Sequence, residues 1–315
     1  MTSVLLVKTS SLGDVVHNLP VVSDIRRALP DARIDWVVEA SYAAIPALHP
    51  GLRDVIPVNV RRWRRSWWRS DTRAEMLALR ERLRSCAYDA IIDTQGLIKS
   101  ALLARAARGK RYGLDWVSAR EPLRWLYDRT FRVPWHSHAV ERNRTLAALA
   151  LGYALSPEVD YGVSSQALRD TDDESYAVLL HATSAGSKLW PEAHWIALAH
   201  YFEQTGRRVL LPWGTASERA RSERLARDMT NATVPGALSL AQAADVLSRA
   251  HVVVGLDTGL THLAGALGVP TVGVYVATDP VATGLYGCAH AVNVGGRNGP
   301  PDAQAVIEAL GRLPA

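Results

Sequence analysis

Short apolar runs alternate with amphipathic helical patterns along the whole chain. In the first half, apolar runs predict strands at residues 4–8, 34–39, 54–58 and 90–93. Helical patterns are predicted at residues 14–29, 42–48, 72–86, 97–107, 122–128 and 138–151. Strands that alternate with helices predict a parallel sheet with helices on both faces.

The alternation restarts after residues 152–171, which are typical of a linker. Strands are predicted at residues 176–181, 208–211, 252–256 and 271–275, with helices at 192–203, 217–229, 240–248, 258–267 and 302–313. Two domains are the default for 315 residues, and we place them at 1–160 and 161–315. We predict an α/β protein with two Rossmann-like, doubly wound domains and a ligand cleft at the carboxyl ends of the strands.

Composition narrows the class of protein. A hydrophobic content of 48% fits a soluble globular chain, and two distant cysteines exclude a disulfide framework and a cysteine zinc site. The apolar run at residues 4–7 is too short for a signal peptide, and the most apolar window, 251–276, is interrupted by polar residues and glycines. We therefore expect a cytoplasmic protein without a membrane span.

Charge is distributed unevenly. Residues 1–160 hold 25 Lys and Arg against 17 Asp and Glu, whereas the remainder holds 11 against 14. The basic first half predicts an anionic partner, such as nucleic acid, a lipid headgroup or a phosphorylated glycan.

The segment 251–270 contains the clearest candidate binding turn. A buried strand at 252–256 leads through Asp257, Thr258 and Gly259 into a helix. Unpaired N–H groups at such a helix start favour a phosphate, and Asp257 and His262 could contact sugar hydroxyls. The alternative interpretation is a helix-capping Asp and a core His.

A second candidate turn, 8–14, follows the first strand. It lacks both the G-x-G-x-x-G and the P-loop spacing, which argues against nicotinamide and ATP sites. It offers Asp14 as an ionised base, or simply as a first-turn carboxylate that interacts with the helix dipole.

A third candidate segment, 181–191, brings Thr183, Ser184 and Lys188 to a strand end. Hydroxyls and one ammonium could hold a diphosphate as it leaves, although Lys188 could also be a solvated loop residue. Glu218 follows another glycine turn, where it could accept bonds from ribose hydroxyls or cap its helix.

Residues 61–69 contain five arginines and three tryptophans, among them Arg61, Arg62, Arg64 and Arg65. We interpret this segment as a basic loop for nucleic acid, a membrane surface or an anionic glycolipid, rather than a merely solvated loop.

Together these segments resemble the heptosyltransferases of lipopolysaccharide inner-core synthesis, glycosyltransferase family 9. The resemblance covers nearly the whole chain. It is carried by residues 8–20 (KTSSLGDVVHNLP), 92–100 (IDTQGLIKS), 118–122 (SAREP), 188–191 (KLWP), 211–214 (LPWG), 257–262 (DTGLTH) and 278–280 (TDP).

The resemblance implies a GT-B fold, whose last helix may return to the first domain. It also implies transfer of L-glycero-D-manno-heptose from ADP-heptose to the Kdo residue of Kdo2-lipid A. The transfer inverts the anomeric carbon and requires no metal or other cofactor. We expect a monomer on the cytoplasmic face of the inner membrane, with no nucleic-acid partner. The alternatives are a heptosyltransferase II, which adds the second heptose, and a non-catalytic GT-B protein that binds anionic glycolipid.

The resemblance also implies roles for individual residues. Asp14 would be the general base, and Lys188 would stabilise the leaving group. Residues implied to bind the donor are Thr183, Ser184, Lys188, Glu218, Leu238, Asp257, Thr258, Gly259 and His262. Those implied to bind the acceptor are Arg61, Arg62, Arg64, Arg65 and Arg120. Ser184 and Leu238 stand where related sequences often have threonine and methionine. A metal would require clustered carboxylates, and the D-x-D sequence at Asp170 and Asp172 lies beside the linker.

Overall fold

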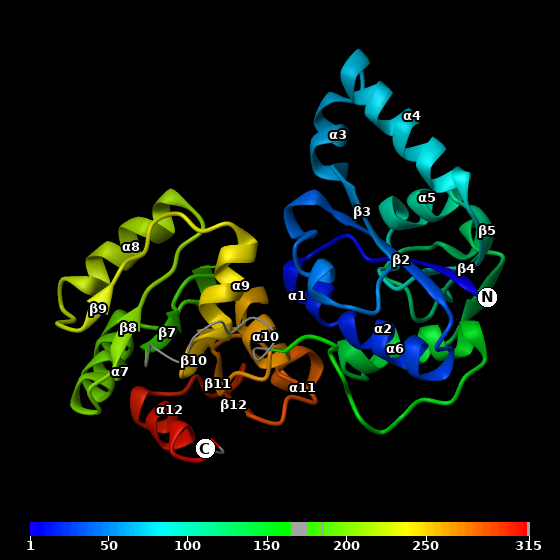
Figure 1. Cartoon of the computed structure of the whole chain (residues 1–315). Coiled ribbons are helices and arrows are strands. Elements are labelled where there is room, and N and C mark those ends of the chain that lie inside the picture. Colours follow the sequence, from blue (N-terminus) through cyan, green and yellow to red (C-terminus); the bar gives the residue numbers. More distant parts are fainter. Residues whose placement is uncertain (165–175, 184–185, 314–315) are drawn as a thin grey trace. The chain divides into compact units, whose positions relative to one another are not determined.

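A computed structural model describes residues 1–164, 176–183 and 186–313 of the chain. The chain forms two compact units, Met1–Gly162 and Val163–Ala315, coloured blue to green and green to red in Figure 1. Their boundary lies two residues beyond the expected one and within the segment 152–171 that was predicted to be the linker. Ser184 and the Asp170–Asp172 sequence lie outside the described residues.

The first unit is built on a six-stranded sheet with the order β3-β2-β1-β4-β5-β6, in which every neighbouring pair is parallel. Its strands are β1 (Ser3–Val7), β2 (Arg33–Glu39), β3 (Asp54–Val58), β4 (Ala87–Asp93), β5 (Arg108–Leu114) and β6 (Arg129–Phe131). Strand β1 is apolar and buried after Ser3, and β2 is buried after Arg33 although it also carries Asp35 and Glu39, as expected of central strands covered on both faces.

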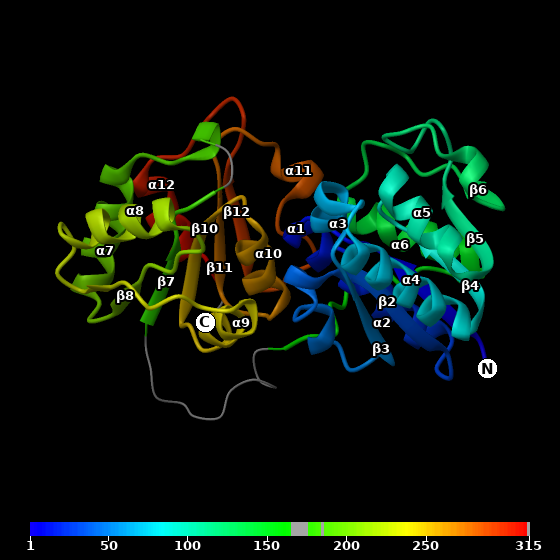
Figure 2. The same ribbon diagram turned by 90° about the horizontal axis from the view of Figure 1, so that it is seen from above.

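The helices of the first unit are α1 (Leu12–Val16), α2 (Leu19–Ala28), α3 (Val60–Ser66), α4 (Ser70–Ser85), α5 (Ile98–Ala106) and α6 (Ala139–Leu151). Helices α2 and α6 cover one face of the sheet, and α4 and α5 cover the other (Figures 1 and 2). On the second of these faces, Leu5, Val37 and Ile91 of the strands pack with Leu83 and Leu103 of the helices.

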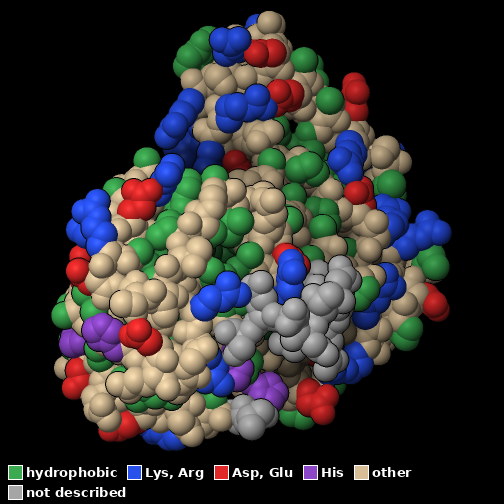
Figure 3. All heavy atoms as spheres, turned by 60° about the vertical axis from the view of Figure 1, so that its left-hand side comes forward, with side chains coloured by type: hydrophobic (Ala, Val, Ile, Leu, Met, Phe, Trp, Pro, Cys, Tyr) green, Lys and Arg blue, Asp and Glu red, His purple; other side chains and the backbone are tan. Residues whose placement is uncertain are grey.

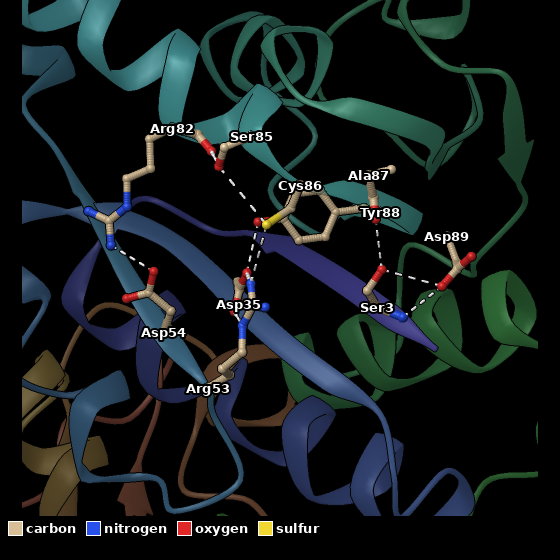
Figure 4. A network of polar contacts seen from close by, with 10 residues as sticks. All are labelled: Ser3, Asp35, Arg53, Asp54, Arg82, Ser85, Cys86, Ala87, Tyr88 and Asp89. Carbon is tan, nitrogen blue, oxygen red and sulfur yellow. Dashed lines mark hydrogen bonds and ion pairs between the residues drawn. The ribbon is translucent and has the colours of Figure 1, made fainter. Parts of the chain in front are cut away.

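A polar network, buried at Asp35 and exposed at Ser3 and Asp89, joins the amino-terminal ends of these strands (Figure 4). The carboxylate of Asp35 on β2 accepts hydrogen bonds from Arg53 Nε at 2.8 Å and from the Tyr88 hydroxyl of β4 at 2.8 Å. On β1, the backbone N–H of Ser3 donates to Asp89 Oδ2 at 2.7 Å. Because these contacts pair a buried carboxylate with donors, they fix the strands at the end opposite the carboxyl edge.

The second unit has a six-stranded parallel sheet with the order β12-β11-β10-β7-β8-β9. Its strands are β7 (Tyr176–Leu180), β8 (Arg208–Leu210), β9 (Ala232–Thr233), β10 (Val252–Leu256), β11 (Thr271–Tyr275) and β12 (Ala291–Gly295). Its helices are α7 (Glu192–Gln204), α8 (Ala216–Ala226), α9 (Leu240–Ser248), α10 (Gly259–Ala266), α11 (Pro280–Thr283) and α12 (Ala303–Leu310).

Helix α12 packs within the second unit. It contacts α7, β11 and β12, and its Val306 is fully buried in the core of that unit. The apolar face of α12 is thus used by the sheet beside it, and a return of the last helix to the first domain stays a prediction.

Both units have the strand order of a Rossmann fold. The order reverses between β1 and β4 in the first unit and between β7 and β10 in the second. Ligands of such sheets bind outside the carboxyl ends of the strands at these reversals. The structure thus places two of the candidate turns, 8–14 and 257–259, directly after β1 and β10.

Several predicted elements differ from the structure, two of them where proline interrupts a helical pattern. The helix predicted at 14–29 is broken at Asn18, ahead of Pro20, into α1 and α2. The helix predicted at 42–48 is a pair of 3₁₀ turns that includes Pro46, and the one at 122–128 is a single turn, Arg124–Leu126. The basic loop predicted at 61–69 is largely the helix α3.

Strands β5, β6, β9 and β12 were not predicted, because none of them is a buried apolar run. The first half of β5 is Arg-Gly-Lys, and its residues are exposed. The remaining strands fall within a few residues of their predicted positions, and the α/β class is confirmed. No helix among the described residues is both long and apolar enough to span a bilayer.

Candidate active site

In the first unit, the candidate base Asp14 is held by the turn that begins α1. Asp14 Oδ2 accepts hydrogen bonds from the backbone N–H of Ser11 at 2.8 Å and from the Ser11 hydroxyl at 2.9 Å. This pairing of residues three apart caps the helix, so Asp14 has the first-turn role that was one of its two interpretations. Among the described residues none donates to Oδ1, and the half-buried carboxylate can accept another hydrogen bond there.

The positive charge of Lys8 favours the ionised form of the Asp14 carboxylate. Its ammonium is buried and donates to the Thr94 carbonyl at 3.0 Å and to Asn143 Oδ1 at 3.4 Å. Burial acts to raise the pKa of Asp14, but the positive charge of Lys8 and the Ser11 hydrogen bonds outweigh it and hold that pKa below its usual value. Burial also lowers the pKa of Lys8 itself. Asp14 is therefore ionised at neutral pH, as a general base requires.

Replacing Lys8 tests whether its charge lowers the pKa of Asp14. We expect Lys8→Met to raise the pKa of Asp14, because the charge that lowers this pKa most is lost while burial remains. Activity that needs ionised Asp14 would then fall away at a higher pH than in the wild type as the solution is acidified. The acidic limb of the kcat/KM profile measures this shift. Lys110→Met, which changes an exposed lysine of β5, should leave the limb in place; an unshifted limb in Lys8→Met would show that Lys8 does not set the pKa.

Gln95, which follows β4, holds the loop that carries the base. Its Oε1 accepts from the Thr9 N–H and from the Thr9 hydroxyl, both at 2.7 Å, and its Nε2 donates to the Ser10 carbonyl at 3.0 Å. Lys99 adds a bond from its Nζ to Ser10 Oγ at 2.7 Å. No role was predicted for Lys8, Gln95 or Lys99, although all three lie in the segments that carry the family resemblance.

The arginines expected to contact an acceptor lie together on α3. Trp63 is buried beneath them and donates from Nε1 to Glu75 Oε2 at 2.9 Å, while Arg62 forms an ion pair with the same carboxylate. The four arginines 61, 62, 64 and 65 are exposed. Arg120 is also exposed, and its guanidinium lies 5.9 Å from the centre of the Trp135 ring. The helix thus presents a basic surface over one buried tryptophan.

In the second unit, Asp257 is the centre of the candidate donor site. Its Oδ2 forms an ion pair with Lys188 Nζ at 2.7 Å and accepts from the Thr278 hydroxyl at 2.7 Å. Its Oδ1 lies 3.3 Å from His262 Nε2. The structure therefore brings together Lys188, Asp257 and His262, three residues predicted from two separate segments, and adds Thr278, for which no role was predicted.

These contacts keep the Asp257 carboxylate ionised. Burial acts to raise the pKa of Asp257, yet the hydrogen bonds from His262, Lys188 and Thr278 hold it far below its usual value. An anionic ligand that attracts Lys188 would have to compete with this carboxylate for the ammonium. Lys188 and Asp257 therefore form one ion pair at the carboxyl edge of the second sheet.

The start of α10 supplies uncharged hydrogen-bond donors beside Asp257. Thr258 is the N-cap and Gly259 the first helical residue, so their N–H groups lie at the positive end of the helix. Gly255 on β10 has no room for a side chain, because a Cβ there would collide with the Thr261 hydroxyl. That hydroxyl donates to the Leu256 carbonyl at 2.6 Å, which fixes the strand-to-helix turn.

No hydrogen bond joins the other described donor residues, Thr183, Glu218 and Leu238, to Lys188, Asp257 or His262. Glu218 Oε2 accepts from the N–H groups of Gly214 and Thr215 at 2.8 and 2.9 Å, so Glu218 caps α8. Leu238 is half-buried just before the N-cap of α9, and Thr183 is half-buried after β7. The described residues contain no group of three or more metal-ligating side chains.

Comparison with known proteins places this geometry in a family. Residues 76–306 match the family model described as glycosyltransferase family 9 (heptosyltransferase). The chain belongs to this family. The lipopolysaccharide heptosyltransferase 1 of Pseudomonas aeruginosa is 49% identical over 288 residues, which cover 90% of this chain and 81% of the relative. That of Escherichia coli K12 is 46% identical over 290 residues, with 90% and 91% covered.

Solved structures of family members agree. Escherichia coli heptosyltransferase WaaC with ADP matches at a TM-score of 0.92 and 43% identity, covering 98% of this chain and 99% of that chain. Escherichia coli heptosyltransferase II reaches a TM-score of 0.76 at 21% identity over 99% of this chain and 98% of its own, which shows the shared fold alone. The predicted GT-B class and the glycosyltransferase class are confirmed.

Proposed function

We propose that this member of the family is an inverting heptosyltransferase of lipopolysaccharide core synthesis. It moves L-glycero-D-manno-heptose from ADP-heptose to a Kdo residue of Kdo2-lipid A. The observation that carries this proposal is the near full-length likeness to heptosyltransferase 1 proteins at 46–49% identity. The carboxylate and ammonium that the reaction needs both lie at Rossmann switch points.

The second unit would bind the donor. The diphosphate of ADP-heptose would accept hydrogen bonds from Thr258 and Gly259 at the start of α10 and would attract Lys188. WaaC has been solved with ADP and with ADP-2-deoxy-2-fluoro heptose, which supports ADP-heptose as a substrate of this chain. Asp257, once it shares Lys188 with the diphosphate, would keep acceptor capacity for heptose hydroxyls.

The first unit would bind the acceptor and supply the base. An acceptor hydroxyl would donate to Asp14 Oδ1, and the arginines of α3 with Arg120 would pair with phosphates and Kdo carboxylates. As the hydroxyl oxygen attacks the anomeric carbon, its proton passes to Asp14. The bond from that carbon to the ADP oxygen breaks on the opposite side. ADP leaves with the bonding electron pair, and Lys188 offsets the negative charge.

The setting of the enzyme is part of the proposal. Exposed arginines on α3, followed by exposed Trp67 and Trp68, suit peripheral contact with an anionic lipid surface. We propose that the protein works as a monomer on the cytoplasmic face of the inner membrane, without nucleic acid. It is also proposed to work without a metal, since Lys188 and the α10 amino terminus can carry the leaving-group charge.

The deciding experiment is ADP release by the purified chain supplied with ADP-heptose, with and without Kdo2-lipid A. ADP that appears only with Kdo2-lipid A, together with a heptosylated product, supports the proposal. Turnover only with heptosylated Kdo2-lipid A would instead identify a heptosyltransferase II. Binding of the glycolipid without any ADP release would contradict an enzymatic role.

A further inference from the structure

An apolar groove of about 980 Å³ lies among α3, α4 and α5. Its apolar wall is formed by Trp63, Trp67, Met76, Leu77, Ile98 and Leu102. We call it the α3–α5 groove. All three helices belong to the first unit, and Figure 1 shows α3 and α4 projecting together beyond the sheet, with α5 below them.

The wall of the groove is unusually exposed for such side chains. Trp67 is 62% exposed, and Leu77 and Leu102 are each 56% exposed. Helix positions that face water normally carry polar residues, so apolar residues gathered from separate helices indicate a ligand surface. Among the large hydrophobic side chains described as exposed, only Leu189 and Val281 come from the second unit.

Positive charge borders the same groove. Arg64, Arg80 and Lys99 line it, against a single acidic residue, Glu121. In Figure 3, the top of the molecule, where α3 and α4 lie, shows Lys and Arg side chains beside hydrophobic ones. An apolar cavity edged by cations complements an amphiphile with an apolar tail and an anionic head.

The groove is joined to the candidate base by a short series of contacts. Lys99 lines the groove, and its Nζ donates to Ser10 Oγ at 2.7 Å. The adjacent residue, Ser11, donates to the carboxylate of Asp14 at 2.8 Å. One amphiphile could therefore place a hydroxyl at Asp14 and extend its apolar part past Lys99 into the groove.

We propose that the α3–α5 groove binds an acyl chain of the anionic glycolipid acceptor. This inference rests on the proposed function, because it assigns part of the acceptor to a surface outside the sugar site. A single chain fits the evidence better than a bilayer face does, since the surface is hollowed and its volume lies within the range of about 300–1,000 Å³ of small-molecule sites. The cations at its border match the phosphates and carboxylates of such a lipid.

Methionine provides a local probe, because the chain has only Met1, Met76 and Met229. Met76 lines the groove, whereas Met229 is buried in the second unit. The full chain, labelled with ¹³C at the methionine methyl groups, would be observed by NMR in neutral detergent micelles. Kdo2-lipid A, its fully deacylated headgroup and phosphatidylglycerol would each be added in turn, and Met76→Leu would assign the signal.

We expect Kdo2-lipid A to shift the Met76 signal, the deacylated headgroup to leave it in place, and Met229 to stay unchanged throughout. A shift of equal size with the headgroup, or none with Kdo2-lipid A, overturns the inference. An equal shift with phosphatidylglycerol also overturns it, because the groove would then take bulk lipid.

Kinetics with a groove variant gives a second readout. We expect Leu102→Gln to raise KM for Kdo2-lipid A about tenfold, because a leucine contact with the chain is lost, and to leave KM for the deacylated acceptor within about twofold. Leu149→Gln is the matched control, since Leu149 is 43% exposed on α6, away from the groove. Equal effects on both acceptors would contradict acyl binding. If wild type heptosylates the deacylated acceptor but no acyl dependence appears, only this inference fails; if it heptosylates neither acceptor, the proposed function fails.

Discussion

Asp14→Asn is expected to lower kcat by about 10²–10⁴-fold while the affinity for ADP-heptose stays close to that of the wild type. The amide keeps the shape of the carboxylate and an oxygen that can accept from Ser11, so α1 should remain capped. What it loses is the ability to take a proton from the acceptor hydroxyl. Single-turnover rates and donor binding, measured on the same preparation, separate these two effects.

A stability measurement and a second variant separate loss of the base from other causes of low activity. The melting temperature of Asp14→Asn should stay near that of the wild type, since a collapse of the fold would also abolish activity. Ser11→Ala should reduce kcat less than Asp14→Asn does, because it removes only one of the two hydrogen bonds to Oδ2. A variant with Asn at position 14 that turns over at the wild-type rate would rule out Asp14 as the base.

Lys188→Met is expected to lower kcat by about 10²–10³-fold and also to weaken the binding of ADP. The ammonium offsets charge that develops on the departing diphosphate, so its loss should affect the transition state more than the ground state. Stopped-flow or quench measurement of product formation gives kcat, and titration with ADP gives the binding constant.

Lys188→Arg should recover part of the activity, because it restores the charge with a different geometry. Asp257→Asn provides the complementary test: it removes the negative partner of Lys188, so ADP should bind at least as tightly although the turn itself loses an ion pair. Unchanged kcat in Lys188→Met would show that the α10 amino terminus alone stabilises the leaving group.

The sequence best predicted those parts of the candidate site that lie within one strand and the turn that follows it. The run 252–256 and the residues 257–259 could be placed on a strand and a helix start because their local pattern is apolar, then polar, then small. Asp14 was predicted for the same reason. Its capping bond to Ser11 is also local, three residues apart, so both interpretations of Asp14 are compatible.

The rest of the site depends on contacts that local patterns do not contain. Gln95 holds Thr9 and Ser10 across a separation of about 86 residues, and Thr278 reaches Asp257 from the end of the next strand. The segment 61–69 was interpreted as a loop because its apolar residues have no helical period, and Trp63 is the one residue of α3 that is buried. Glu218 was left between two roles, and the structure shows the capping role.

The placement of lysine has a practical consequence for labelling in solution. Of the four lysines, Lys8 is buried under Asp14, Lys99 touches Ser10, Lys188 is paired with Asp257, and Lys110 is exposed on β5. Lysine acylation measured by mass spectrometry would therefore report on the candidate base through Lys8 and on the candidate donor site through Lys188. Lys110 would serve as the internal reference. Slow acylation of Lys8, rapid acylation of Lys110 and donor-dependent protection of Lys188 would report occupancy without any engineered label.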